Sequence, residues 1–331
     1  MVELDAISHK LMIIVGILMY IFGIIGNLIN ICVFIKWSRP KRRTNNQINV
    51  NNQTGNSSLY LLTTSFANLI LLIYPLLIRI YVDGFEYLVT KTNSIFLCKF
   101  RYYILQTSLI ISLICTCLAT FDRYLITSRS VRLRQLSTSR GNTIRIIIIV
   151  IIFSSLHSIP IGIYYDRSII GDCSITSIIY SNYYLYFVIV FLYGIFPIIF
   201  LFIFGRLTYK QLKILKRTTY NGQLNLNKQI SKMLLFQCIA LVFSYIPYCI
   251  QNIYFSKFVD KTIYPTSFNL LFRIITIILF YVNPVTSFYI FFISTPNFRK
   301  EAIRFMLCKY HHHHHIVDNR IHTITHTVDQ R

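Results

Sequence analysis

Neighbouring acidic and basic side chains stand directly after a long apolar run in the first half of the chain. Asp122, Arg123 and Tyr124 follow Tyr102–Phe121, a stretch that contains no charged side chain. An aspartate beside an arginine can form an ion pair near the edge of an apolar environment, where each charge needs a partner. Opening such a pair releases a cation for another contact. The chemistry that this triplet offers is therefore reversible charge pairing rather than catalysis.

The elements that must position this triplet are apolar helices. The chain has 331 residues, of which 54% are hydrophobic and 13% charged, and its mean hydropathy of +0.55 is far too high for an ordinary soluble domain. A helix needs about 20 residues to cross roughly 30 Å of hydrocarbon. Because lipid offers no partner for unpaired backbone groups, and barrel strands would alternate in polarity, long charge-free runs predict membrane-spanning helices. Seven runs qualify: Leu11–Ile35, Leu59–Ile78, Tyr102–Phe121, Ile146–Tyr165, Tyr183–Gly205, Met233–Ser256 and Ile274–Phe298.

The segments around these runs divide the chain into three parts. We expect an extracellular N-terminal tail at residues 1–10, a seven-helix bundle at 11–300 and a cytoplasmic tail at 301–331. Glu3 and Asp5, rather than a basic leader, precede the first run, which favours a membrane span over a cleaved signal peptide. The Asn-rich insert Lys36–Ser58 is predicted to be a loop. The run His311–His315 lacks the spacing of a metal site, so no metal is expected.

Charge placement predicts the orientation of the bundle. The loops after spans one, three and five, together with the C-terminal tail, hold 24 of the 33 Lys and Arg residues, whereas most acidic residues lie on the other side. Because cytoplasmic loops collect basic residues, we expect the N-terminus outside and the C-terminus inside. The basic face would attract anionic membrane lipid. Its charges are spread over loops that membrane spans separate, so nucleic acid is not an expected partner.

Short motifs stand in several of these spans: Gly26–Asn27, Asp122–Arg123–Tyr124, Pro247 and Asn283–Pro284. Together they resemble the motifs of the rhodopsin-like class (class A, family 1) of G-protein-coupled receptors. The resemblance covers roughly Gly16 to Arg304, and the segment "TPNFRKEAIRF" is similar to the amphipathic eighth helix of that class. It implies an all-α membrane protein with a seven-helix bundle in the plasma membrane, coupling to a heterotrimeric G protein, no enzymatic activity and no cofactor.

The resemblance also implies a signalling switch. In the family, the Asp of this triplet holds the Arg at rest, and the Arg meets the G protein when the bundle opens. We expect the Asp122–Arg123 pair to be partly exposed to water and worth about 1 kcal/mol, and Pro247 to kink its helix. The implied switch residues are Asn27, Asn68, Asp122, Arg123, Tyr124, Tyr245, Pro247, Asn283 and Pro284.

Four positions depart from the family pattern at this switch. Asn68 stands where the family has a sodium-binding aspartate, which argues against an allosteric sodium site. Tyr245 occupies the place of a tryptophan, and Gly205 and Ser287 each replace a tyrosine. The resemblance therefore leaves open whether the altered switch still signals.

Cysteine positions predict one covalent link. Cys98 and Cys173 are the two cysteines expected outside the membrane, and a lone pair in an oxidising compartment favours a disulfide. The resemblance implies the same link, between the third span and the second extracellular loop. Cys308, just past the amphipathic segment, suits reversible palmitoylation, and a plain free thiol fits that position equally.

Absent charges limit the class of ligand. No span contains Asp or Glu, which disfavours an aminergic pocket, and the seventh span lacks the lysine of a retinal Schiff base. Polar residues near the outer end suit a ligand with an anionic or amide end inside, and acids in the outer loops, Asp83 among them, suit basic groups at the rim. The candidate ligand contacts are Arg79, Tyr103, Gln106, Gln251, Asn252 and Arg273.

A short extracellular peptide meets these requirements, and the variants "NPVTSFYIFF" and "FSYIPY" look most like invertebrate receptors for FMRFamide-like neuropeptides. Two alternatives stay open for the function. One is a chemosensory receptor for small molecules, and the other is a seven-span transporter or channel, for which inverted repeats and midplane charges would be the signature. For Arg79 and Arg273, the alternative is that they extend to lipid headgroups.

Overall fold

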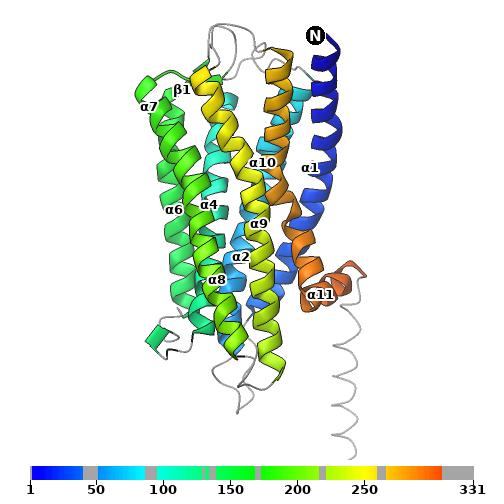
Figure 1. The fold of residues 1–331 in the computed structure, drawn as a ribbon, viewed down its shortest axis with the longest axis vertical. Coiled ribbons are helices and arrows are strands. Elements are labelled where there is room, and N and C mark those ends of the chain that lie inside the picture. The colour runs from blue at the N-terminus through cyan, green and yellow to red at the C-terminus, as the bar shows by residue number, and fades with distance from the viewer. Residues whose placement is uncertain are drawn as a thin grey trace, which may run out of the picture.

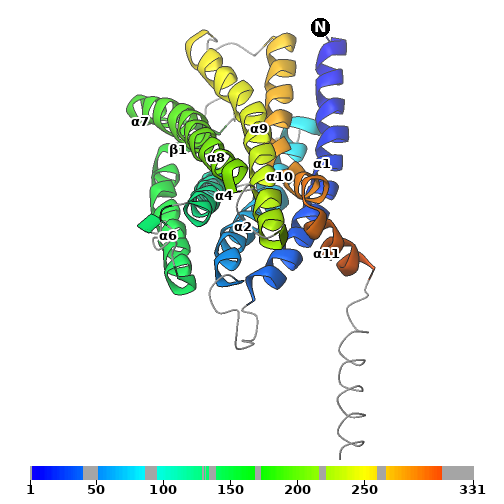
Figure 2. The same cartoon turned by 60° about the horizontal axis from the view of Figure 1, so that its bottom comes forward.

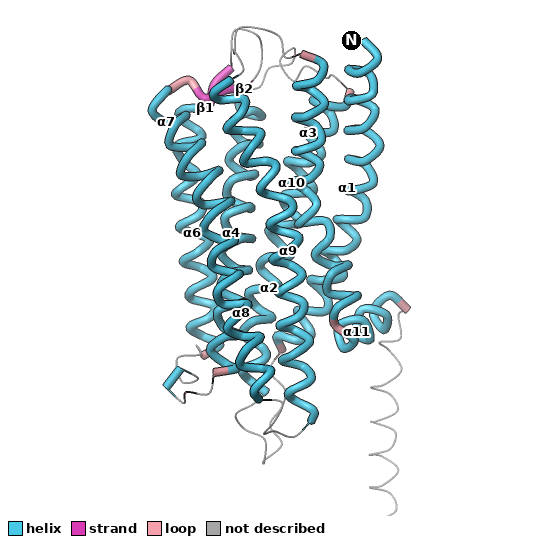
Figure 3. Tube along the Cα trace, viewed as in Figure 1, coloured by secondary structure: helices cyan, strands magenta, loops and turns pink. Residues whose placement is uncertain are grey.

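A bundle of long helices makes up the protein (Figure 1). The computed structural model describes residues 2–39, 51–85, 95–128, 130, 132–133, 139–167, 173–215, 221–258 and 266–307. The bundle has two ends. The N-terminal end carries the N-terminus and a short hairpin, and the C-terminal end carries a helix that turns away from the bundle axis (Figure 3). The helices are α1 (Val2–Ser38), α2 (Asn51–Leu71), α3 (Leu77–Arg79), α4 (Ile95–Thr127), α6 (Arg140–Tyr164), α7 (Ile178–Tyr183), α8 (Phe196–Leu215), α9 (Asn221–Phe258), α10 (Ser267–Ser294) and α11 (Pro296–Met306).

Wider π-helical turns join some of these helices into continuous rods. η1 (Leu72–Leu76) and η2 (Ile80–Gly84) extend α2 and α3, and η3 (Tyr184–Ile195) joins α7 to α8. Pro75 lies inside η1, where a proline cannot donate the usual helical hydrogen bond and a wider turn can accommodate its ring. Each rod thereby crosses the bundle as one element.

Seven helical stretches in the described part of the chain are long and apolar enough to span a membrane. Each overlaps one of the seven predicted runs, although the fourth and seventh helices end before their predicted runs do. Apolar side chains such as Ile149, Ile163 and Phe243 remain exposed on their outer surfaces. In a soluble protein such exposure would be costly, but lipid is the natural environment for it. The predicted seven-helix membrane bundle is confirmed.

The ends of several elements differ from the sequence prediction. α1 is helical from Val2, so most of the expected N-terminal tail is helix. Asn51–Ser58 forms the first turns of α2 rather than part of a loop, because the side chains of Asn56, Ser57 and Ser58 are buried between helices.

The seventh helix ends at Ser294 instead of Phe298. Thr295 is extended, as the residue before a proline prefers, and Pro296 begins α11, so the predicted span is divided there.

The core forms where α4 packs against α2, α6, α8 and α9, while α1 lies between α2 and α10. Glycines allow the closest approach on α1. A Cβ on Gly26 would lie 2.8 Å from the Cβ of Phe288, and one on Gly23 would lie 2.8 Å from Leu72. A larger residue at either position would push α1 away from its neighbours. In the tilted view, α1 and α6 stand on opposite sides of the bundle (Figure 2).

Two short elements close the ends. At the N-terminal end, β1 (Tyr165–Arg167) pairs with β2 (Cys173–Ile175) in an antiparallel hairpin. At the C-terminal end, α11 buries Phe298 and Ala302 and exposes most of its other face. This burial pattern is that of an amphipathic helix, as the sequence predicted.

Candidate functional site

The Asp122–Arg123 pair lies at the C-terminal end, near the end of α4. Both residues are buried: Asp122 is 4% exposed and Arg123 is 0% exposed. The expectation of a partly exposed pair was therefore wrong. The reason is the central place of α4, whose last turns are covered by α2 and α8, so water has little access to either side chain. A buried pair differs from a surface pair, because removing one partner leaves the other charge without compensation.

A serine on α2 holds the acidic member of the pair. The Ser57 hydroxyl donates a short hydrogen bond to the Asp122 carboxylate. Asp122 also lies close enough to Arg123 to stabilise its charge. One turn further along α4, the Thr127 hydroxyl lies 3.0 Å from Gln211 Oε1 on α8. α2, α4 and α8 are thus tied together around the pair.

Tyr124, the third member of the triplet, points elsewhere. Its ring packs against Phe204 of α8 with a centroid distance of 5.4 Å and against Phe121. The triplet is thereby divided between a buried charge pair and an aromatic contact between α4 and α8. Among the described residues, no atom lies within 4 Å of a hypothetical Cβ on Gly205, next to Phe204, so this position borders open space.

A buried polar cluster crosses the middle of the bundle around the proline of α10. Asn27 Nδ2 on α1 donates to the carbonyl of Pro284 at 2.9 Å and to the carbonyl of Gly23 at 2.8 Å. Gln237 Nε2 on α9 donates to Asn283 Oδ1 at 3.0 Å. Polar groups need such partners in an apolar interior. Asn27, Asn283 and Pro284 are therefore brought together as the switch prediction requires.

Two positions that depart from the family pattern have local partners. The amide of Asn30 on α1 lies 3.3 Å from the Ser287 hydroxyl, so a serine at this position still links α10 to α1. The Ser112 hydroxyl on α4 donates to Asn68 Oδ1 on α2 at 2.7 Å. An uncharged amide bound to a hydroxyl joins two helices without providing the carboxylate that a cation site needs.

Tyr245 and Pro247 belong to α9. Tyr245 is 1% exposed, packs edge-on against Phe280 of α10 with a centroid distance of 5.4 Å, and lies close to Asn283. Pro247, two residues later, lies inside the helix and lacks the N–H of an ordinary helical residue. α9 is thus fixed to α10 just beside its weakest helical turn.

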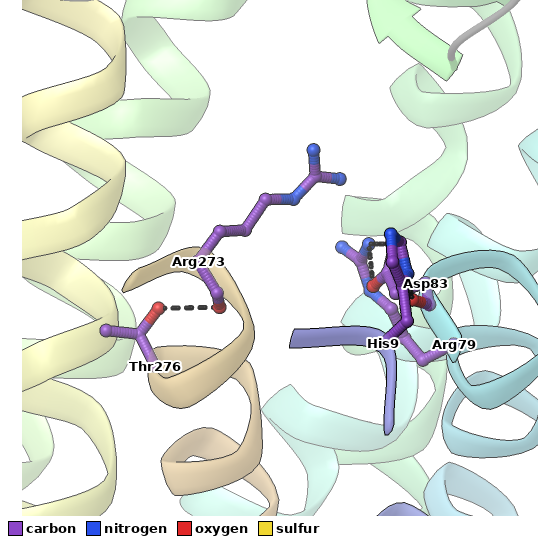
Figure 4. A network of polar contacts seen from close by, with 5 residues as sticks. All are labelled: His9, Arg79, Asp83, Arg273 and Thr276. Atoms are coloured by element: carbon purple, nitrogen blue, oxygen red, sulfur yellow. Dashed lines mark hydrogen bonds and ion pairs between the residues drawn. The ribbon is translucent and has the colours of Figure 1, made fainter. Parts of the chain in front are cut away.

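The N-terminal end holds an ion pair that the sequence did not predict. Arg79 Nη1 lies 2.9 Å from Asp83 Oδ2, one helical turn away, and both side chains are largely buried. The His9 ring donates from Nδ1 to the backbone carbonyl of Asp83 at 2.6 Å (Figure 4). Asp83 was expected in an outer loop, facing a ligand's basic groups. That expectation was wrong, because the helical rod continues through Gly84 and turns this carboxylate inward.

Arg273 lies across from that pair. Its side chain extends from α10 toward the Arg79–Asp83 pair, and only its backbone carbonyl accepts a hydrogen bond, from Thr276 (Figure 4). Among the residues that the structure describes, no side chain pairs with its guanidinium.

The other predicted ligand contacts make bonds of their own. Gln106 is 1% exposed, and its amide lies 3.0 Å from His157 Nδ1 on α6. Asn252 donates to the Tyr248 carbonyl at 2.8 Å and lies 3.4 Å from Gln251 Oε1. Within the described part of the chain, these side chains are not hydrogen-bonded to Arg79 or Arg273.

Tyr103 and its neighbour Tyr102 both pack partly against the apolar core, and Tyr102 also lies close to the three arginines. The ring of Tyr102 also packs against Tyr165 at 4.5 Å. Successive residues of a helix point about 100° apart, so sequence proximity alone did not distinguish the two tyrosines.

A disulfide joins the hairpin to the bundle. Cys98 near the start of α4 is bonded to Cys173 of β2, with a Cα–Cα distance of 5.9 Å. The predicted link is confirmed. Cys308 and the histidine run lie outside the described residues, so palmitoylation of Cys308 stays a prediction.

The seven-helix bundle, the polar cluster around Pro284 and the disulfide define a seven-helix membrane receptor of the rhodopsin type. A family model described as "7 transmembrane receptor (rhodopsin family)" matches residues 26–287. Because this match covers most of the chain, the protein belongs to that family. Among curated proteins, no sequence matches the chain. Members of the family are multi-pass membrane receptors rather than enzymes, and they bind ligands and act through G proteins.

Proposed function

We propose that the protein is a plasma-membrane receptor that detects an extracellular peptide and activates a heterotrimeric G protein. The observation that carries this proposal is the buried Asp122–Arg123 pair, held by Ser57 at the C-terminal end of the bundle. A charge pair enclosed by three helices is a two-state element, because the arginine either stays with its aspartate or becomes available at an opened end. Charge placement supports a cytoplasmic location for that end.

Activation would require α8 and α9 to move away from α4. Pro247 provides a weak turn in α9, and the contacts of α9 near that turn run through Tyr245 and Gln237 to α10. A ligand can drive this movement only by binding the open state more tightly than the closed state. The altered residues Asn68 and Ser287 keep interhelical hydrogen bonds, which supports a switch that still functions.

The N-terminal end supplies the features that favour a peptide ligand. It combines buried arginines with tyrosine hydroxyls, and Asp166 lies in β1 nearby. Guanidinium groups recognise a peptide's carboxylate or carbonyl oxygens, and acids at the rim complement basic side chains. A chemosensory receptor for small molecules would use the same bundle, so the ligand test must include both classes.

The proposal is tested by expressing the full chain in cells and measuring G-protein nucleotide exchange against a neuropeptide library and a panel of volatile small molecules. We expect at least one peptide to raise exchange in the wild type. Arg123→Ala should abolish that response and leave peptide binding largely intact at equal surface density. A response to volatile compounds alone would replace the peptide proposal, and exchange that persists in Arg123→Ala would contradict the proposed role of the pair.

A further inference from the structure

A third arginine at the N-terminal end carries an inference about the ligand. Arg101 lies on α4, three residues after Cys98, and is only 7% exposed. Its Nε has no hydrogen-bond partner among the described residues, and its guanidinium lies 5.3 Å from the centre of the Tyr102 ring. A buried cation without a carboxylate is costly, and contact with an aromatic ring replaces only part of its lost hydration.

Arg101 belongs to the same cluster as Arg79 and Arg273. Asp83 lies close enough to interact with the charges of all three arginines, and the Tyr102 hydroxyl is near the same three cations. In the described part of the chain, this cluster therefore contains three positive charges and one negative charge. The imbalance leaves an excess of two positive charges, of which Arg101 is buried and Arg273 half-buried.

Asp83 cannot correct this imbalance by moving from one arginine to another. Its carboxylate is bonded to Arg79 through both oxygens, at 2.9 and 3.3 Å, within one turn of the same rod. The hydrogen bond from His9 to its backbone carbonyl fixes the turn that carries it. Asp83 therefore forms its ion pair with Arg79, and among the described residues no carboxylate forms an ion pair with Arg101 or Arg273.

We propose that Arg101 and Arg273, flanked by the Arg79–Asp83 pair, form a binding site for an anionic group of the ligand. The inference rests on the proposed receptor function and adds a choice between two ligand chemistries. A carboxylate, sulfate or phosphate supplies the missing negative charge and accepts paired hydrogen bonds from guanidinium groups. A peptide amide is neutral and leaves the cluster unbalanced. The ligand therefore presents a free anion to this site.

The site is tested first without any receptor ligand, using inorganic sulfate as the probe. The full chain is purified in detergent micelles, and its thermal unfolding is measured in sodium sulfate and in sodium chloride of equal ionic strength. Sulfate also stabilises proteins by exclusion from their surface, so the informative quantity is the difference between variants. We expect sulfate to raise the Tm of the wild type by about 2–4 °C more than that of Arg101→Gln or Arg273→Gln.

Lys257→Gln is the matched control, because Lys257 is an exposed cation at the same end, 5.6 Å from the Tyr186 ring. This variant should keep the full response to sulfate. Arg101→Gln removes an uncompensated buried charge, so it should fold and unfold at no lower temperature than the wild type in chloride. Equal sulfate responses in the wild type and both cluster variants would overturn the anion site.

A second measurement separates this inference from the proposed receptor function. Each activating peptide is assayed as the free acid and as the C-terminal amide, and the free acid should be at least tenfold more potent in the wild type but not in Arg101→Gln. Peptides active only as amides would overturn the anion site and leave the receptor proposal standing. Sulfate stabilisation that depends on Arg101, without G-protein activation by any ligand, would leave the site standing and overturn the receptor proposal.

Discussion

The two ends of the bundle differ in how their buried charges are paired. At the C-terminal end, Asp122 accompanies Arg123, and Ser57 supplies a further bond to the acid. At the N-terminal end, one acid serves three arginines, and Arg101 keeps an unpaired Nε. We call the C-terminal end balanced and the N-terminal end unbalanced. Separating the charges of the balanced end costs free energy, whereas a counter-charge that binds at the unbalanced end lowers the free energy. A ligand-operated switch requires this difference. The N-terminal end can bind an anion, and the C-terminal end holds the charge pair that opens.

The largest effect is expected from removing the charge of Asp122 at the balanced end. Asp122→Asn preserves the shape and an acceptor for Ser57 but leaves Arg123 buried without a counter-charge, which costs about 3–5 kcal/mol in the closed state. Because each 1.4 kcal/mol shifts a two-state ratio tenfold, basal nucleotide exchange should rise at least tenfold. The measurement is ligand-independent exchange at equal surface density.

Glu301→Gln is the control for that experiment. Glu301 is an acid at the same end, but it pairs with Lys36 and Arg304 on the outer side of the bundle. Its removal should leave basal exchange within about twofold of the wild type, since exposed ion pairs contribute little. Equal basal exchange in Asp122→Asn and the wild type would show that the pair does not hold the closed state.

The next effect concerns the covalent link at the unbalanced end. Cys98→Ser should lower the free energy of unfolding by about 2–4 kcal/mol, because the disulfide constrains the unfolded chain and holds the hairpin over α4. Thermal unfolding of the purified protein measures this loss. Cys32→Ser, at a free and partly buried cysteine of α1, is the matched control and should unfold close to the wild type. A Cys98→Ser protein as stable as this control would argue that the link has no structural role.

A smaller effect should follow from replacing one arginine of the N-terminal cluster. Arg273→Gln should weaken the potency of an anionic agonist by about 2 kcal/mol, within the range for a hydrogen bond to a charged group, which corresponds to roughly a 30-fold higher half-maximal concentration. Concentration–response curves for nucleotide exchange provide the measurement. Lys257→Gln should leave potency unchanged. Unchanged potency in Arg273→Gln would mean that this side chain extends to headgroups instead.

The smallest effect is expected from removing the hydroxyl that binds Asp122 at the balanced end. Ser57→Ala removes one bond to Asp122, and we expect a loss of about 1.5 kcal/mol in the closed state, the lower end of the range for charged groups, because Asp122 keeps other contacts. Basal exchange should then rise about tenfold at most, and less than in Asp122→Asn. Ser65→Ala is the control, since that hydroxyl bonds the Leu61 carbonyl of its own helix and no other described residue.

Much of the fold was predictable from the sequence, because the membrane restricts what an apolar chain can form. Seven charge-free runs predicted seven helices, and the positions of Cys98 and Cys173 outside the spans predicted the disulfide between them. The motifs around Asn27 and Pro284 predicted the family to which the chain belongs. Boundaries such as the break before Pro296 were missed, since hydropathy continues across Thr295 and only backbone geometry ends the helix there.

The sequence by itself determined the number of spans, the membrane as solvent and the uneven distribution of charge along the chain. Only the tertiary structure decided how each charge is used. The direction of a side chain around its helix depends on packing. The sequence therefore placed Asp83 in an outer loop and did not single out Tyr102 or Arg101. Likewise, Asp122 and Arg123 are buried because α2, α4 and α8 pack together around them. This burial, which makes the loss of either charge costly, arises only when segments distant in the sequence meet.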